Sequence, residues 1–357
     1  MTQQRGYPAW RCDEGDVMNV EEFKQYLDEK SRFIDGEIEK FVLEGEKIEN
    51  LHDGMAYSLG LDTPDRNTRG KRVRPVLALM TCESLGEDYS KAIPFAISAE
   101  LLHSFLLVHD DIEDEDEVRR NRPSVWKKFG SAHGINIGDY IFVKTYRAIL
   151  RGGDVGVGND QLVKLVDLLT KTVDRTGIGQ AMDIGARDSN DISVEEYMRT
   201  VTEKTGYYLA YPIIGGAIIS GASDETLKSL EEFGKYIGPV FQIADDILDL
   251  TEGKGREEIG CDVKEGKRSL LVALASSECT QEEKERLFEI LNKRREYTSD
   301  EDVSWVISLF DKYQIIDKAK DRAREMLGAA KTSIQNVPEE LRENLSAAAE
   351  FFLDRKI

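Results

Sequence analysis

Apolar side chains recur about every 3.6 residues along most of the chain, and no segment shows a sustained alternation of apolar and polar positions. The pattern is clear from Val20 to about Lys47, where it predicts an amphipathic helix. From Ala210 to Ala222 nearly every position is apolar, which predicts a helix buried on all sides. The hydrophobic pattern therefore predicts an all-α protein.

The predicted helices are separated by short segments rich in turn-forming residues, at 121–134, 152–160, 188–192 and 253–266. Ser193, Thr280 and Thr298 each precede a Glu by three positions, which is typical of a helix N-terminus. No interruption is long or biased enough to be an interdomain linker, so we expect one all-α domain over residues 18–357, with loops around the mouth of a central cavity. Residues 1–17 lack both periodicity and an apolar signal-peptide core. We expect a loose extension there, with Met18 as the functional start.

The segment from Glu100 to Arg120 contains an apolar run that leads into seven acids within eight residues. On a helix, Asp110 and Asp114 share a face one turn apart, Asp111 lies about 100° round, and His103 precedes them on nearly the same face. Clustered carboxylates repel one another unless hard cations neutralise them, and oxygen ligands suit Mg²⁺. Taken alone, the run is equally typical of a solvated acidic surface.

A second acidic triplet makes the metal-site interpretation the stronger one. Asp245, Asp246 and Asp249 repeat the spacing of the first triplet within an apolar segment. Three acids in apolar surroundings are either paired or coordinate metal. Two such helices predict a cavity lined with carboxylates from opposite sides.

The chain resembles the trans-polyprenyl diphosphate synthases over roughly residues 20 to 350. Both DDxxD motifs match the two aspartate-rich motifs of that family, and shorter motifs follow in the family order. These are Gly70-Lys71-Arg72-Val73-Arg74-Pro75, Arg119-Arg120, Gly179-Gln180-Ala181-Met182-Asp183, Lys204-Thr205 and Gly266-Lys267-Arg268.

The resemblance implies a single-domain bundle of about ten or more helices around the cavity, of the isoprenoid synthase type. It implies head-to-tail condensation of isopentenyl diphosphate with dimethylallyl, geranyl or farnesyl diphosphate, with roughly three Mg²⁺ ions per active site. Asp110, Asp114 and Asp245 would be ligands. Asp111, Asp246 and Asp249 would be further ligands or would orient bound water.

The resemblance also assigns residues to the two diphosphates. Isopentenyl diphosphate would be bound by Lys71, Arg74, His103 and Arg120, and the allylic diphosphate by Arg119, Lys204 and Lys267. Thr205 and Gln242 would direct oxygens at the allylic cation. One departure concerns a Lys that the family places after the second Asp motif: here Glu257 and Glu258 stand near that spacing, and Lys254 or Arg256 is the candidate replacement.

Product length is expected to depend on the side chains just before the first motif. Phe105 is aromatic, Leu106 is not, and the motif has no insertion, a combination that resembles short-chain synthases making the C20 product. We therefore expect geranylgeranyl diphosphate. The alternatives are farnesyl diphosphate, a product of C25 or longer, or a role as one subunit of a heteromeric synthase.

Composition narrows the setting. A net charge of −20 argues against nucleic acid or an anionic membrane as partner, and bound metal would supply the positive charge that diphosphates require. The four cysteines are widely spaced, which favours a reduced, cytoplasmic compartment without zinc or disulfides. No run of about 18 apolar residues predicts a membrane span. By resemblance we expect a homodimer.

Two other protein classes also place acids on helices. A di-iron carboxylate protein needs two Glu-x-x-His motifs inside its helix bundle, and Glu100 and His103 have the right spacing for one of them. A terpene cyclase would not need a second DDxxD or the cations Lys71, Arg74 and Arg120. A non-catalytic partner subunit tends to lose acids from these motifs, whereas this chain keeps all six.

Overall fold

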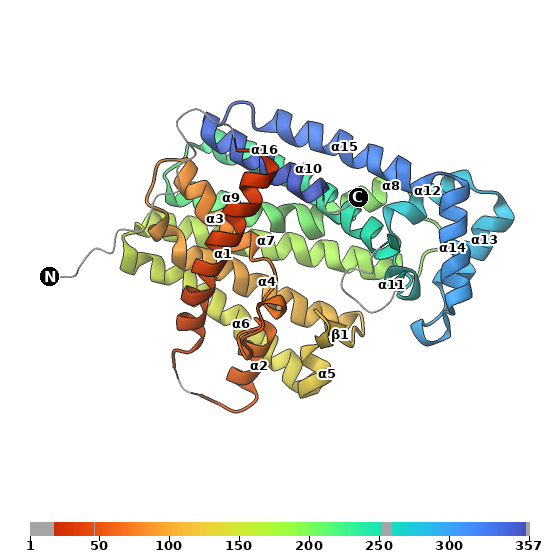
Figure 1. Ribbon diagram of the computed structural model, residues 1–357, viewed down its shortest axis with the longest axis horizontal. Coiled ribbons are helices and arrows are strands. Elements are labelled where there is room, and N and C mark those ends of the chain that lie inside the picture. Colours follow the sequence, from red (N-terminus) through yellow and green to blue (C-terminus); the bar gives the residue numbers. More distant parts are fainter. Residues whose placement is uncertain (1–17, 46, 252–258, 355–357) are drawn as a thin grey trace.

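The computed structural model describes residues 18–45, 47–251 and 259–354, and over these ranges it confirms the all-α prediction (Figure 1). The α-helices are α1 (Val20–Val42), α2 (Leu51–Ser58), α3 (Val73–Ser84), α4 (Ile93–Glu113), α5 (Val125–Phe129), α6 (Ser131–Leu150), α7 (Asn159–Ala186), α8 (Val194–Val201), α9 (Tyr207–Ile219), α10 (Asp224–Thr251), α11 (Cys261–Lys264), α12 (Leu270–Glu278), α13 (Gln281–Leu291), α14 (Asp300–Lys312), α15 (Ile315–Ser333) and α16 (Glu339–Leu353). Short helical turns are η1 (Arg66–Thr68), η2 (Tyr89–Ala92), η3 (Arg151–Val155), η4 (Thr202–Gly206) and η6 (Arg295–Tyr297). Strands β1 (Val118–Arg119) and β2 (Arg122–Pro123) form an antiparallel hairpin.

Helix boundaries follow local capping signals. Capping boxes at Ser193 and Thr280 start α8 and α13, as predicted. The prediction at Thr298 was wrong by one residue, because Ser299 caps α14 with Asp302 as its partner. The predicted end of α1 was also too late: Gly45 has a φ of +101°, which an α-helix cannot accommodate.

The helices pack around two apolar clusters that share α10 and α15. Leu230, Phe233 and Ile237 belong to the larger cluster, with α1 to α7, α9 and α16. Ile243 and Ile247 belong to the smaller one, with α8 and α11 to α15. Figure 1 shows α12, α13 and α14 gathered at one end of the molecule. Because α10 and α15 each run through both clusters, we propose that residues 18–357 form one domain.

The central helices α4 and α9 are apolar around most of their circumference because they are covered on several sides. Helix α4 packs on α3 and α6, and α9 packs on α3, α7 and α10. The segment 210–222 was predicted to be buried, and α9 is buried along nearly its whole length. The segment Tyr89–Glu113 is apolar and long enough to cross a membrane, because it contains an 18-residue stretch with a mean hydropathy of 1.5. However, 67% of this stretch is buried inside the protein. Its composition is that of a core helix.

Candidate active site

A single cavity of about 890 Å³ brings most of the predicted site residues together. Helices α3, α4, α7, α9 and α10 form its walls, together with η4 and the loops after α4 and α11. The predicted residues that line it are Lys71, Arg74, His103, Phe105, Leu106, Asp110, Arg119, Arg120, Lys204, Thr205, Gln242, Asp245 and Lys267. Asp111, Asp114, Asp246 and Asp249 do not line this cavity.

The first acidic motif lies where α4 ends. The backbone N–H of Asp116 donates to the Asp111 carbonyl at 2.9 Å, and Glu115 adopts a φ of +55°. This is a Schellman turn, which terminates the helix and sends the chain back across its end. Such a turn usually has glycine at the left-handed position. Asp110 therefore projects from the last helical turn, whereas Asp114 lies just beyond it.

Asp110 faces basic and amide groups across the cavity. Its Oδ1 lies 3.5 Å from Lys204 Nζ and accepts from Gln180 Nε2 at 3.2 Å. Burial opposes ionisation of this carboxyl, but the charges of Lys204, Arg119 and Lys267 outweigh it and hold the pKa below its usual range. Asp110 is therefore a carboxylate at neutral pH.

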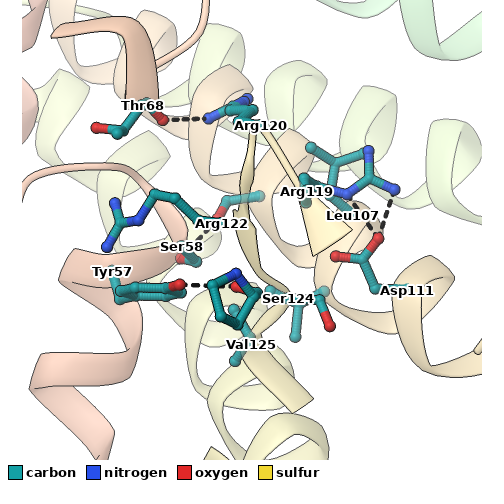
Figure 2. Close-up of a pocket in the computed structure, with 13 residues that line it drawn as sticks. Tyr57, Ser58, Thr68, Leu107, Asp111, Arg119, Arg120, Arg122, Ser124 and Val125 are labelled. Atoms are coloured by element: carbon teal, nitrogen blue, oxygen red, sulfur yellow. Dashed lines mark hydrogen bonds and ion pairs between the residues drawn. The ribbon is translucent and has the colours of Figure 1, made fainter. Parts of the chain in front are cut away.

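Asp111 does not line this cavity and pairs with Arg119, whose Nε donates to Oδ1 at 2.5 Å. Burial raises the pKa of Asp111 to about 6, with the Arg119 charge offsetting part of the effect. Asp111 and Arg119 also line a second, smaller cavity of about 40 Å³ behind the motif. Figure 2 shows Arg119 turned toward Asp111 and Arg120 turned toward Thr68.

The second motif divides in the same way. Asp245 lines the cavity, whereas Asp246 accepts from the Tyr197 hydroxyl at 2.8 Å and from Gln242 Nε2 at 2.9 Å. Asp249 is fully buried and accepts from the backbone N–H of Asp262 at 3.0 Å. In each motif the first acid faces the cavity, while the others bind neighbouring protein groups.

The carboxylate oxygens that face the cavity suit a hard divalent cation that also binds substrate phosphates. Among the described residues no three His, Cys, Asp or Glu side chains converge into a complete metal site. Mg²⁺ does not require one, because it is commonly held by one or two carboxylates together with waters and substrate phosphates. Asp110 and Asp245 provide carboxylates on different walls, from α4 and α10.

A group of cations lines another part of the cavity. The Arg74 guanidinium lies 4.1 Å from the centre of the Tyr208 ring, and the Tyr208 hydroxyl is hydrogen-bonded to His103 Nδ1. Arg74 Nε is buried without a hydrogen-bond partner in the described part of the chain. A buried donor of this kind is costly unless a ligand or water satisfies it.

The β1–β2 hairpin positions Arg119 and Arg120. Arg120 and Asn121 form its two-residue turn, with φ values of +54° and +58°. Arg120 Nη1 donates to the Thr68 carbonyl at 3.1 Å, and its guanidinium lies against Gly70, where a Cβ would be only 2.8 Å away. Burial and the nearby cations lower the pKa of Arg120 to about 10, so it remains charged at neutral pH. The sequence pattern did not predict this hairpin.

Lys204 and Thr205 lie on η4, a single π-helical turn between α8 and α9. Such turns are frequent at functional sites. Lys204 Nζ also bonds Asp183 Oδ2 at 2.8 Å, and Gln180 donates to both Asp110 and Glu113. The motif at residues 179–183 contains Gln180 and Asp183, but the sequence assigned neither of them a role. Their spacing on α7 places them one turn apart, facing the first acidic motif.

Phe105 and Leu106 lie in the cavity wall, with Leu106 one helical turn before Asp110 and Phe105 directly before Leu106. The Phe105 ring stacks on Phe142 of α6, with ring centres 4.7 Å apart and an interplanar angle of 23°. His109 contacts the same ring edge-on at 4.8 Å. The aromatic wall predicted at Phe105 is therefore reinforced by a neighbouring helix.

The candidates Lys254 and Arg256, with Glu257 and Glu258, lie outside the described residues. Lys267 follows that gap and bonds Glu265 at 2.7 Å and Asp262 at 3.2 Å. These contacts connect Lys267, which is predicted to bind the allylic diphosphate, to the segment 262–265. The backbone N–H of Asp262 in this segment also donates to Asp249.

His103 is expected to make folding stability sensitive to acid. Burial, and then the charges of Arg74 and Arg120, lower its pKa well below the usual range. Below about pH 6.5 the unfolded chain gains a proton that the folded chain does not, so stability is lost as pH falls, by at most about 1.4 kcal/mol per pH unit. His103→Gln should make that loss shallower in urea titrations from pH 7.5 to 5. The exposed His133→Gln is the control, and an unchanged slope in His103→Gln would contradict the prediction.

Comparison with known proteins identifies the class. The polyprenyl synthetase family model matches residues 65–310. The short chain isoprenyl diphosphate synthase of Methanothermobacter thermautotrophicus is 36% identical over 291 residues, covering 80% of this chain and 87% of the relative. The geranylgeranyl pyrophosphate synthase of Geoglobus acetivorans is 32% identical over 334 residues, covering 93% and 98%.

A solved structure gives the same result. The geranylgeranyl pyrophosphate synthetase of Pyrococcus horikoshii superposes with a TM-score of 0.82 at 30% identity, covering 94% of this chain and 99% of that one. The fold and cavity thus define an all-α prenyltransferase. The chain belongs to the polyprenyl synthetase family and is a trans-prenyltransferase acting on isoprenyl diphosphates.

Proposed function

We propose that the chain is a Mg²⁺-dependent synthase that condenses isopentenyl diphosphate with dimethylallyl, geranyl or farnesyl diphosphate and ends at geranylgeranyl diphosphate. The observation that supports this most is the composition of one cavity. It combines carboxylates on two walls, two groups of cations and an apolar end formed by Phe105 and Leu106. Such a cavity suits a substrate with a diphosphate head and a hydrocarbon tail.

The allylic diphosphate is held near Asp110 and Asp245. Lys204, Arg119 and Lys267 line this part and donate to its oxygens. Bound Mg²⁺ supplies further positive charge for the developing leaving group. As the carbon–oxygen bond breaks, the side chains of Lys204, Arg119 and Lys267 stabilise the leaving diphosphate without having to reorganise.

The allylic cation is then stabilised by oxygens from η4 and α10. Gln242 donates its amide N–H to Asp246 at 2.9 Å, which leaves its Oε1 near Thr205 Oγ1, 3.4 Å away. Asp246 thereby orients Gln242. We propose that this is its role in place of direct metal ligation.

Isopentenyl diphosphate is bound by Lys71, Arg74, His103 and Arg120. Neutral His103 can donate through one ring nitrogen, and Arg74 has a buried donor ready for an oxygen. The double bond of isopentenyl diphosphate attacks the allylic carbon. The released diphosphate then takes the proton, so no protein base is required. Catalysis is then positioning, desolvation and electrostatics.

A product assay tests the proposal. Purified protein receives isopentenyl diphosphate with each allylic primer, in Mg²⁺ or in EDTA, and the dephosphorylated alcohols are separated by length. We expect a C20 alcohol only with Mg²⁺. A C15 stop or a ladder beyond C20 would overturn the product assignment, and no elongation with any primer would favour a subunit of a heteromeric synthase.

Phe105→Ala is expected to lengthen the product. Removing the ring opens the wall next to Phe142, so the tail can extend further before elongation stops. The chain-length distribution of the alcohols measures the effect. Phe105→Tyr keeps the ring and should retain the C20 product, and an unchanged distribution in Phe105→Ala would show that the stop lies elsewhere.

We also propose a cytoplasmic homodimer. Large apolar side chains are exposed on two adjacent helices, with Val143 and Leu150 on α6 and Val163 and Ile178 on α7. Exposed apolar side chains on neighbouring elements are typical of a protein interface.

A further inference from the structure

Asp114 has a partner that the proposed reaction does not use. Its Oδ1 is paired with Arg187 Nη2, which follows α7 directly. The Asp114 side chain is only 3% exposed and that of Arg187 is 21% exposed, so the pair is mostly shielded from water. Removing one partner of such a pair leaves an uncompensated, mostly buried charge.

The arginine occupies an oxygen that a metal would need. Asp114 is a proposed Mg²⁺ ligand, and a guanidinium bonded to its Oδ1 competes with a cation both for that atom and for its charge. Arg187 is not fully satisfied in this position, because its Nε is buried without a hydrogen-bond partner among the described residues. The guanidinium therefore retains a free donor of the type that suits diphosphate oxygens.

We propose that Arg187 is a positioning residue that acts as the resident counter-cation of Asp114 and thereby weakens Mg²⁺ binding at the first acidic motif. The proposal rests on the proposed Mg²⁺-dependent function. Without metal, Arg187 neutralises Asp114 and fixes its carboxylate at the end of α4. Metal binding must displace this pair, so the metal concentration required is higher than the carboxylates alone would set.

The alternative is that the pair only joins α4 to α7. A purely structural pair would lower stability equally with and without metal when it is removed. A competing pair would lower stability mainly without metal, because Mg²⁺ can replace the missing charge. The dependence of the unfolding temperature on Mg²⁺ distinguishes the two.

The experiment is thermal unfolding of the full chain titrated with Mg²⁺ in the presence of inorganic diphosphate. Arg187→Gln should lower the unfolding temperature in EDTA and lower the half-saturating Mg²⁺ concentration by about fivefold, as expected for removal of a modest ion pair. Arg187→Lys keeps the charge and should restore the midpoint toward wild type. If Arg187→Gln does not fold in EDTA, Arg187→Met preserves the apolar stem for the same measurement.

Two further variants sharpen the test. Arg175→Gln removes an arginine of α7 that pairs with Glu203, and this variant should keep the wild-type midpoint. In an Asp114→Asn background, Arg187→Gln should no longer change the midpoint, because the competition has been removed. An unchanged or higher midpoint in Arg187→Gln alone overturns the proposal. Absence of any Mg²⁺ shift in wild type overturns the metal requirement as well, whereas C20 synthesis is tested separately by the product assay.

Discussion

Asp110→Asn is expected to lower kcat about 10³-fold, the largest loss of any single substitution in the cavity. Asparagine keeps the size of the side chain and can still accept from Gln180, but it removes the charge that faces Lys204. It also removes the carboxylate proposed to hold Mg²⁺ against the leaving diphosphate. Steady-state kinetics with geranyl diphosphate measure the loss.

The pattern of parameters matters as much as the loss of rate. The KM for isopentenyl diphosphate should stay near wild type, because Lys71, Arg74 and Arg120 are unchanged. Glu117→Gln is the matched control: this acid belongs to the same run, is exposed and pairs with Lys127, and its replacement should leave kcat unchanged. A loss of less than about tenfold in Asp110→Asn would exclude a central role for this carboxylate in ionisation.

The sequence predicted the helices that carry the site because their signals are local. The apolar run before each acidic motif predicts a buried helix that carries the acids. In the structure Asp110 on α4 and Asp245 on α10 line the same cavity. The family resemblance then linked residues far apart in the chain. All the predicted diphosphate-binding side chains line that cavity.

The division of labour within each motif could not be predicted. Spacing placed Asp114 one turn after Asp110, and the structure agrees: the Asp114 N–H donates to the Asp110 carbonyl at 2.8 Å, and the Schellman turn follows at Glu115. Glutamate gives no signal for such a turn, which usually has glycine or asparagine at that position. The Asp114 side chain is paired with Arg187, a residue 73 positions later, and no local pattern reports that contact.

The hairpin was missed for a similar reason. Each strand has two residues, too few to show alternation, and Asn121 in the turn is the main local cue.

Tertiary packing also determines which groups Asp246 and Asp249 bind. Asp246 binds Tyr197 and Gln242, and Asp249 binds the Asp262 backbone. Such contacts depend on how distant segments meet.

Gly179→Ala is expected to lower kcat about 100-fold without altering any group that contacts substrate. A Cβ at Gly179 would lie 2.2 Å from the backbone N of Lys204 and 2.6 Å from its Cα. Backbone cannot yield as a flexible side chain does, so η4 must move away from α7. Lys204 Nζ would then leave Asp110 and Asp183, and Thr205 would move with it. The overpacked contact should also cost about 1–3 kcal/mol of folding stability.

Kinetics and urea denaturation of two glycine variants separate this effect from a general one. Gly185 lies on the same helix, and a Cβ there meets no atom within 4 Å, so Gly185→Ala should keep wild-type kcat. If Gly179→Ala lost stability but retained kcat, the close approach of α7 and η4 would serve folding alone. If it lost kcat while remaining folded, the glycine of this motif would be required because it lets the Lys204 backbone lie directly against α7, which fixes the lysine beside the first acid.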